Sequence, residues 1–279
     1  MNPIIVSLLR CPICGSAMQM DEAARTCYCT GARTHCYDRA KSGYLNLTSP
    51  KDGEGDLKDA VRARKLFLEA GYYQPLSKAV NALLEACGAS VVVDAGCGEG
   101  YYTNRMSEGR AVLGVDLSRA GIDLAAKAAK QATRDTAFAV ASLYTLPVQN
   151  ESVDAVTNLF APCAEQEFLR VLKQGGYVIL VGAGERHLLG LKQILYDDPY
   201  LNPGRADLPT SMKLIRRERL TYPITVEGRE RIDALFSMTP YYWRTSLEGQ
   251  KRLAALCELQ TEVDFDLYVF QKDEKEKDG

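Results

Sequence analysis

The first 40 residues of the chain contain five of its nine cysteines and one of its two histidines. Cys11 and Cys14 form a C-x2-C pair, a spacing that lets two thiolates reach one metal ion. Cys29 and His35 follow closely and supply a second pair of ligands. Together these four residues predict a tetrahedral Cys3His zinc site.

The third zinc ligand depends on how the chain runs after Thr26. A strand there would point Cys27 and Cys29 to the same face, so the two thiols would compete for one position. We favour Cys29, because it lies nearer the loop that carries His35, and leave Cys27 and Cys36 open as replacements. Four good ligands leave no free coordination position, so we expect the zinc to be structural.

Length and composition bound the kind of protein. The 279 residues with 46% hydrophobic content suit one large domain, or one domain with small appendages. The short apolar run at the amino terminus lacks a basic flank and a cleavage site, and no stretch approaches roughly 18 apolar residues, so we expect a cytoplasmic protein without a membrane span. Thiols stay reduced in that compartment, which argues against a disulfide framework.

The net charge of −2 gives no overall attraction to a polyanion. A nucleic-acid partner would therefore have to be held by local patches of positive charge. The candidates are the segments "RARK", Arg62 to Lys65, and "KLIRRER", Lys213 to Arg219. Each is equally readable as the solvated face of a helix.

A second motif, "SVVVDAGCGEGYYT", begins at Ser90. Its apolar run ends at Asp94 and leads into glycines at positions 96, 98 and 100 and then a helix-forming segment. This is the pattern of a buried parallel strand, a glycine turn that lets a ligand approach the backbone, and a helix. A second strand ends at Asp116, whose carboxylate can accept both hydroxyls of a ribose. The pair predicts an adenosine-containing ligand.

The residues around the glycines distinguish between cofactors. A dinucleotide-binding loop needs a small residue where this chain has Tyr101, which disfavours NAD. The form D-x-G-C-G-x-G instead resembles motif I of the class I S-adenosylmethionine-dependent methyltransferases. That resemblance implies an α/β, Rossmann-like fold with a seven-stranded, mostly parallel sheet. The remaining strands are expected in "AVLGVDLS", "TAFAVAS", "SVDAVTNLF" and "GGYVILVG", with "VDFDLYVFQ" as the antiparallel strand that closes the sheet.

The same resemblance places the parts of the cofactor. Asp94 and the glycine loop, with Gly96, Gly98 and Gly100, would lie near the methionine moiety. Asp116 would bind the ribose, and Ser142, with Ala141 before it, would lie beside the adenine.

The residues after the fourth strand should face the transferred methyl group. Here they are "LFAPC", Leu159 to Cys163, without the "NPPY" or "DPPF" seen in enzymes that methylate exocyclic amines. The "PC" pair is similar to that of carbon-5 cytosine methyltransferases, in which a thiolate attacks the base. Cys163 is thus either such a nucleophile or a small buried residue behind the pocket.

The order of motifs along the chain resembles the RlmA family, including its TlrB branch, which methylates ring nitrogen 1 of a guanine in 23S ribosomal RNA. The motifs are "CPIC", "HCYDRAKSGYLNL", "RARKLFLEAGYYQPL", "DAGCGEGYYT", "APC", "ERHLL" and "MTPYYWR". This resemblance implies that Cys11, Cys14, Cys29 and His35 bind zinc in a substrate-recognition module. It also implies cofactor contacts by Tyr73, Gly98, Glu99 and His187.

Methylation of ring nitrogen 1 makes two demands. This nitrogen carries a proton and lies on the pairing edge, so the base must be exposed and the proton must leave as the methyl arrives. The sequence does not identify the general base. Four aromatic residues are candidates to stack on an exposed base: Tyr101, Tyr241, Tyr242 and Trp243.

We expect three parts along the chain. Residues 1–48 form the zinc-binding RNA-recognition module, 49–75 a linker and lid helix, and 76–279 the methyltransferase domain with an insertion at about 188–245. The two basic segments would flank one cleft and hold a hairpin of 23S ribosomal RNA.

Other readings stay open from the sequence. They are a small-molecule methyltransferase with a structural zinc ribbon, a carbon-5 cytosine methyltransferase that uses Cys163, and a non-catalytic zinc-dependent RNA-binding factor. A homodimer, and the choice between two neighbouring guanines, are also left open.

Overall fold

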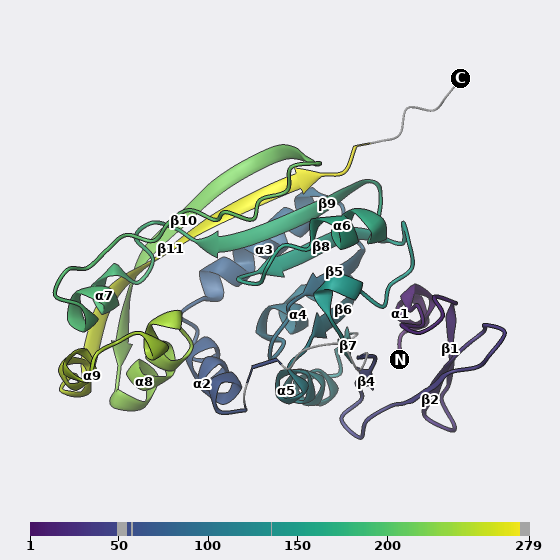
Figure 1. The fold of residues 1–279 in the computed structure, drawn as a ribbon, viewed down its shortest axis with the longest axis horizontal. Coiled ribbons are helices and arrows are strands. Elements are labelled where there is room, and N and C mark those ends of the chain that lie inside the picture. The colour runs from purple at the N-terminus through teal and green to yellow at the C-terminus, as the bar shows by residue number, and fades with distance from the viewer. Residues whose placement is uncertain (49–54, 57, 135, 274–279) are drawn as a thin grey trace.

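Most of the chain is built around one eight-stranded sheet, described here from a computed structural model that covers residues 1–48, 55–56, 58–134 and 136–273 (Figure 1). The six strands from β9 to β4 run parallel, whereas β11 is antiparallel to β9 and β10 is antiparallel to β11. In spatial order the strands are β10 (Lys213–Glu227), β11 (Glu258–Gln271), β9 (Leu172–Ala183), β8 (Val153–Leu159), β5 (Val91–Ala95), β6 (Ala111–Asp116), β7 (Thr136–Val140) and β4 (Leu45–Asn46).

The expected fold class is confirmed, and so is the antiparallel closing strand, which is β11. The sheet has eight strands where seven were expected. The additional strand is β4, in which Leu45 and Asn46 pair in parallel with Ala139 and Val140 of β7. Two residues are too few to give the alternating pattern that marks a strand in a sequence.

Helices cover both faces of the sheet. On β5 the neighbouring residues Val92 and Val93 are fully buried in cores on opposite faces, as expected for a parallel strand with helices on both sides. Within the described residues no helix is long and apolar enough to cross a bilayer. The helices are α1 (Pro3–Leu8), α2 (Lys58–Glu69), α3 (Gln74–Ala86), α4 (Tyr101–Met106), α5 (Arg119–Gln131), α6 (Glu165–Val171), α7 (Leu189–Leu195), α8 (Arg229–Ser237) and α9 (Leu247–Ala254), with short 3-10 helices η1 (Leu143–Thr145) and η2 (Pro240–Trp243).

The amino-terminal segment forms a small antiparallel sheet of β1 (Met18–Asp21), β2 (Thr26–Cys29) and β3 (Cys36–Asp38). It lies at the opposite end of the molecule from α7, α8 and α9 (Figure 1). The apolar run at the start of the chain forms α1, which is capped by Asn2 and buries Ile5 and Leu8 in a core shared with the main sheet. This segment is therefore packed onto the methyltransferase-like sheet.

Two parts of the expected domain plan need comment. The glycine-rich start of the linker falls on residues 49–54 and 57, which lie outside the described residues, and the linker continues as α2. The segment 188–245, expected as an insertion, contains α7, α8 and η2 but also β10, which pairs along its length with β11. Part of this segment therefore belongs to the main sheet.

We expect Gly190→Ala to lower the free energy of unfolding by about 1–3 kcal/mol, because an added Cβ would lie 2.4 Å from the carbonyl oxygen of Gln260 on β11. Gly204→Ala is the matched control, since no atom lies within 4 Å of its Cβ position. The control should change stability by less than about 0.5 kcal/mol. Urea unfolding of both variants measures the difference, and equal stabilities would contradict the packing of α7 on β11.

Candidate functional site

The four predicted zinc ligands meet at one end of the small amino-terminal sheet. The ligand atoms of Cys11, Cys14, Cys29 and His35 all lie within 4.8 Å of one another. The His35 Nδ1 atom is 3.6 Å from the Cys11 sulfur and 3.4 Å from the Cys29 sulfur, and the Cys14 and Cys29 sulfurs are 3.6 Å apart. Zinc–sulfur bonds of about 2.3 Å in a tetrahedron place neighbouring sulfurs about 3.8 Å apart. The donor set and its spacing therefore fit zinc.

Groups around this cluster orient the sulfurs. The Tyr37 hydroxyl lies 3.3 Å from the Cys11 sulfur, and the His35 backbone N–H donates to the Cys29 sulfur at 3.2 Å. Hydrogen bonds from Ser16 lower the pKa of the Cys14 thiol to about 6. Donors of this kind stabilise thiolates and fix the direction of their lone pairs.

The two alternative cysteines lie outside the cluster. Cys27 is buried two residues before Cys29 on β2, and burial raises the pKa of its thiol to about 11. Cys36 is exposed at the start of β3. The geometry thus favours Cys29 as the third ligand, as we preferred from its nearness to His35.

The second site lies at the carboxyl ends of the parallel strands, where β5 leads into the glycine loop. Asp94 is fully enclosed there, and its two carboxylate oxygens accept hydrogen bonds from Thr103 of α4 at 2.6 Å and from Thr157 of β8 at 2.8 Å. Burial raises the pKa of Asp94 to about 6 despite these hydrogen bonds. The carboxylate fixes the strand ends and the helix that surround the loop.

The glycine loop packs too closely for side chains. Gly96, Gly98 and Gly100 all have positive φ, and a Cβ on Gly96 would lie 2.4 Å from the Cβ of Ala161, which follows β8. A Cβ on Gly100 would lie 2.6 Å from the Cβ of Ala125 on α5. Glycine is therefore required at Gly96 and Gly100, and the loop brings backbone without side chains to the carboxyl ends of the strands.

Asp116 and Ser142 end the next two strands of the sheet. The Asp116 carboxylate accepts the backbone N–H of Gly98 at 2.9 Å and that of Ser118 at 2.7 Å. The Ser142 side chain accepts the Tyr144 N–H and begins η1. These residues lie side by side along the cleft, in the order in which ribose and adenine would follow the methionine moiety.

Two buried polar atoms near the loop have no hydrogen-bond partner among the described residues. They are the Oε2 atom of Glu99 and the hydroxyl of Tyr102. Burial raises the pKa of Glu99 to about 7. Burial also raises the pKa of Tyr102, and the nearby Tyr73 and Glu99 add to this increase. Buried polar atoms are normally satisfied, so these atoms suit a polar ligand in the cleft.

The charge of the cleft also fits the proposed cofactor. Carboxylates of Asp94, Glu99 and Asp116 surround it, and burial raises the pKa of each. The guanidinium of Arg64 lies beside them, with its Nη1 3.8 Å from Glu99, while its Nη2 pairs with Asp56 at 2.5 Å. A ligand with a sulfonium and an ammonium group would offset this excess of negative charge.

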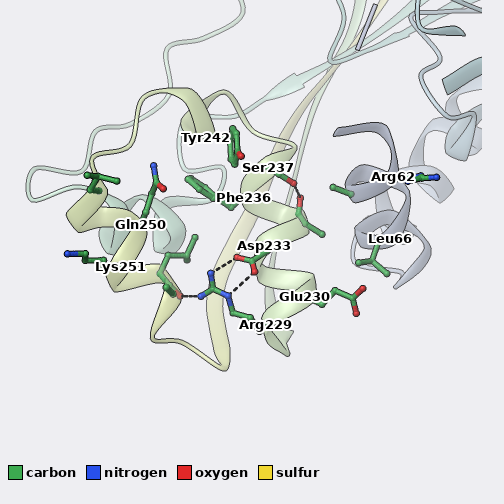
Figure 2. Close-up of a pocket in the computed structure, with 15 residues that line it drawn as sticks. Arg62, Leu66, Arg229, Glu230, Asp233, Phe236, Ser237, Tyr242, Gln250 and Lys251 are labelled. Carbon is green, nitrogen blue, oxygen red and sulfur yellow. Dashed lines mark hydrogen bonds and ion pairs between the residues drawn. The ribbon is translucent and has the colours of Figure 1, made fainter. Parts of the chain in front are cut away.

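The position of Arg64 corrects one expectation. We assigned it to an RNA-binding edge, but its guanidinium pairs with Asp56 and with the buried Glu99 of the glycine loop. Arg62 lies two residues before Arg64 on α2. It lines a separate groove of about 810 Å³ against α8 and α9 (Figure 2). Helix α2 therefore divides this groove from the cleft.

The second basic segment also differs from expectation. Lys213 lies opposite Gln271 near the amino ends of the parallel strands, whereas Arg219 lies near their carboxyl ends. Arg219 is paired with the buried Asp264 at 2.6 Å. The two basic segments therefore do not flank a single cleft, because β10 carries its charges along the whole length of the sheet.

Tyr73 and His187 come together beside Phe265 of β11. The Tyr73 hydroxyl lies 3.3 Å from His187 Nε2, and His187 Nδ1 accepts the backbone N–H of Asp264 at 3.2 Å. Both rings contact the fully buried ring of Phe265, with centroids 5.0 and 4.9 Å away. Burial lowers the pKa of His187 to about 4, so the imidazole is neutral near pH 7.

Of the four aromatic residues expected to stack on a base, two are buried. Tyr101 is 3% exposed beneath Arg105, and Tyr241 is 6% exposed and donates to Asn202. Tyr242 lines the groove beside α8, and Trp243 next to it is 80% exposed. The burial of Tyr101 and Tyr241 argues against stacking on a base by these two residues.

Two family models match the chain. A methyltransferase domain matches residues 92–176, and a zinc-ribbon model described as RlmA, N-terminal, matches residues 9–49. The first contains the glycine loop and the second contains the Cys3His cluster.

Relatives extend this match over nearly the whole chain. A Bacillus subtilis protein, YxjB, which is provisionally named a 23S rRNA (guanine-N(1)-)-methyltransferase, is 32% identical and covers 95% of this chain and 98% of its own. The chain belongs to the RlmA family of 23S rRNA (guanine-N1-)-methyltransferases. The 23S rRNA (guanine(748)-N(1))-methyltransferase of Streptomyces fradiae is 32% identical and spans 70% of both chains.

Sequence reasoning within this RlmA-family chain missed several residues of the cleft. Tyr102 was read only as part of the loop motif, and Phe265 only as part of a strand. Arg205 was not considered, yet its buried guanidinium donates to Asn158 and to the carbonyl oxygen of Ala161. Only Phe265, an apolar residue in a closing strand, had a signal that sequence alone could have supplied.

We predict that Cys14→Ser lowers bound zinc from about one equivalent per chain to near zero and abolishes RNA methylation, while the cleft still binds S-adenosylhomocysteine. The reason is that one of four ligands is lost at a site distant from the glycine loop. Elemental analysis and calorimetry measure the two properties. Cys36→Ser, an exposed neighbour outside the cluster, should keep its zinc, and full activity in a zinc-free protein would refute the assignment.

We predict that S-adenosylmethionine binds about five- to tenfold more tightly at pH 8 than at pH 6. With a pKa of about 7, Glu99 is mostly neutral at pH 6 and mostly ionised at pH 8, and the ionised form favours a cationic ligand. Calorimetry across this range should show a weaker dependence for S-adenosylhomocysteine, which lacks the sulfonium charge. Glu99→Gln should flatten the step near pH 7, and an unchanged step in that variant would contradict the role of Glu99.

Proposed function

We propose that this protein transfers a methyl group from S-adenosylmethionine to ring nitrogen 1 of a guanine in 23S ribosomal RNA. The observation that carries the proposal is the 32% identity to a protein provisionally named for this reaction over 95% of the chain, which includes both the zinc cluster and the cleft. A ribosomal RNA substrate would also place the protein in the cytoplasm, as the composition predicts.

We assign the cofactor to the carboxyl ends of β5, β6 and β7. S-adenosylmethionine supplies an activated methyl group on its sulfonium. The backbone of the glycine loop at Gly96, Gly98 and Gly100, with Asp94 beneath it, would hold the methionine end, and Asp116 and Ser142 would hold ribose and adenine. Tyr73, Glu99 and His187 would line the remaining walls. Support comes from the unpaired polar atoms and the excess of carboxylates described above.

The transfer forms an N–C bond at ring nitrogen 1, breaks the S–C bond of the sulfonium and releases the proton of the nitrogen. His187 does not take this proton, because its Nδ1 atom already accepts a backbone N–H and its pKa is about 4. Its contribution is to orient Tyr73 by hydrogen bonding to the hydroxyl. In-line positioning of the base against the methyl group then supplies much of the rate.

We further propose that the zinc module, residues 1–48, recognises the RNA and that the recognised element is a hairpin. Exposed cations on this module, Arg25, Arg33 and Lys41, would contact phosphates. The stoichiometry of the purified RNA complex decides whether two chains share one hairpin.

The alternative chemistry, carbon-5 methylation of cytosine, needs a thiolate at Cys163. Burial raises the pKa of this thiol to about 11, and the residue is fixed by donation of its backbone N–H to Asp207 at 2.7 Å. Cysteine nucleophiles are instead found where the thiolate is stabilised. The structure therefore favours Cys163 as a residue that packs behind the pocket.

Incubation of the purified protein with undermethylated 23S RNA and methyl-labelled S-adenosylmethionine tests the proposed reaction. Nucleoside mass spectrometry should find the label in 1-methylguanosine, and primer extension should stop at a single guanine. Label in 5-methylcytidine would overturn the assignment of the reaction, and label only in small molecules would overturn the assignment of the substrate.

We predict that Cys163→Ala keeps methylation within about threefold of the wild type, because a protonated, partly buried thiol contributes only packing. Initial rates at saturating RNA and cofactor measure this. A complete loss of turnover, together with a covalent protein–RNA adduct in the wild type, would instead assign the chemistry to the thiolate.

A further inference from the structure

Phe160, immediately after β8, combines three properties that are rarely found together. Its φ is +57°, in the left-handed region that bulky residues seldom adopt. Its side chain is 45% exposed although it is a large apolar residue. It also stands at the carboxyl end of a central parallel strand, where ligands of such sheets bind.

The strained conformation is held from both sides. The Phe160 backbone N–H donates to the carbonyl oxygen of Val181 on β9 at 3.0 Å. On the other side, the buried Arg205 guanidinium donates to Asn158 at 2.8 Å and to the carbonyl oxygen of Ala161 at 2.7 Å. Backbone strain that is fixed in this way is a mark of functional sites.

The neighbours of Phe160 place its ring at the reactive end of the cleft. The next residue, Ala161, lies so close to Gly96 of the glycine loop that an added Cβ on Gly96 would be 2.4 Å from its side chain. The Phe160 ring contacts Phe265 edge to face, with centroids 5.7 Å apart. Phe265 also contacts the buried rings of Tyr73 and His187, so Phe160 is an exposed ring at the edge of a largely buried aromatic cluster.

We propose that the Phe160 ring stacks on the face of the target guanine and holds it in the plane required for transfer. This inference rests on the proposed function and adds the residue that positions the base. A ring that stacks on the face of a purine leaves its pairing edge free, and ring nitrogen 1 lies on that edge. Once the proton of this nitrogen has left, the lone pair that attacks the methyl group lies in the base plane, so fixing the plane also fixes the line of attack.

Stacking explains the exposure and the strain together. A residue that only filled the core would be buried, and a large aromatic residue is an uncommon choice for a position that only turns the chain at this φ. The fixed backbone directs an aromatic ring outwards from the cleft wall, where an extruded base would arrive.

Two substitutions separate the ring from the backbone. Phe160→Asn removes the ring and suits the left-handed conformation, so the chain should still fold, whereas Phe160→Tyr keeps the ring. We expect Phe160→Asn to lower kcat/KM for 23S RNA by about 10- to 100-fold and Phe160→Tyr to stay within about threefold of the wild type. The dissociation constant for S-adenosylhomocysteine should change by less than about twofold in both variants.

Thermal unfolding and calorimetry accompany the kinetic measurement as checks on folding and on the cofactor cleft. Near-wild-type kcat/KM in Phe160→Asn would overturn the inference, as would an equal loss in Phe160→Tyr or a parallel loss of cofactor affinity. If the wild-type protein itself fails to form 1-methylguanosine, the proposed function fails instead, so the two failures are distinguishable.

Discussion

The enclosed carboxylate of Asp94 joins three parts of the chain that must meet for the cleft to exist. It ends β5 and accepts hydroxyls from α4 and from β8, so the start of the helix after the glycine loop and the neighbouring strand are tied to one point. A buried carboxylate without these partners would be costly, which makes the arrangement specific. With these elements fixed, the loop can pack against Ala161 and Ala125 with no room for a Cβ.

The zinc module is connected to the main sheet by a linker and also packs directly against it. Its helix α1 shares a core with the main sheet, Leu9 bridges to Val148, and β4 adds two residues beyond β7. Zinc would stabilise a small sheet whose own core is limited, and the shared core would then hold that sheet in a constant position relative to the cleft. If this module recognises RNA as proposed, its fixed position would direct the bound RNA to one place on the sheet edge.

Sequence reasoning succeeded where local spacing determines the chemistry. The C-x2-C pair, the glycine loop after a β-branched run and Asp116 at the end of the next strand were all placed correctly in space, because each depends on residues close in the chain. Predictions from the sequence were wrong where the role of a residue depends on the direction in which its side chain points. Arg64 has the pattern of a solvated helix, but it faces the acids of the cleft. Tyr101 was a candidate to stack on a base, but it packs in the core.

Other features were invisible because they depend on contacts between distant segments. The φ of Phe160 follows from anchoring by Arg205 and Val181, which lie at least 20 residues away in the chain. Burial beside Phe265 lowers the pKa of His187 and keeps the imidazole neutral, although the nearby Asp264 raises this pKa. The residue types near these positions in the sequence do not indicate such contacts.

The most direct test of the central claim is the modification state of 23S ribosomal RNA in host cells that lack this chain. Nucleoside mass spectrometry and primer extension on their ribosomal RNA should show loss of 1-methylguanosine at one site, restored by the intact chain and not by a variant with a disrupted glycine loop. An unchanged 1-methylguanosine content in cells without the chain would contradict the account.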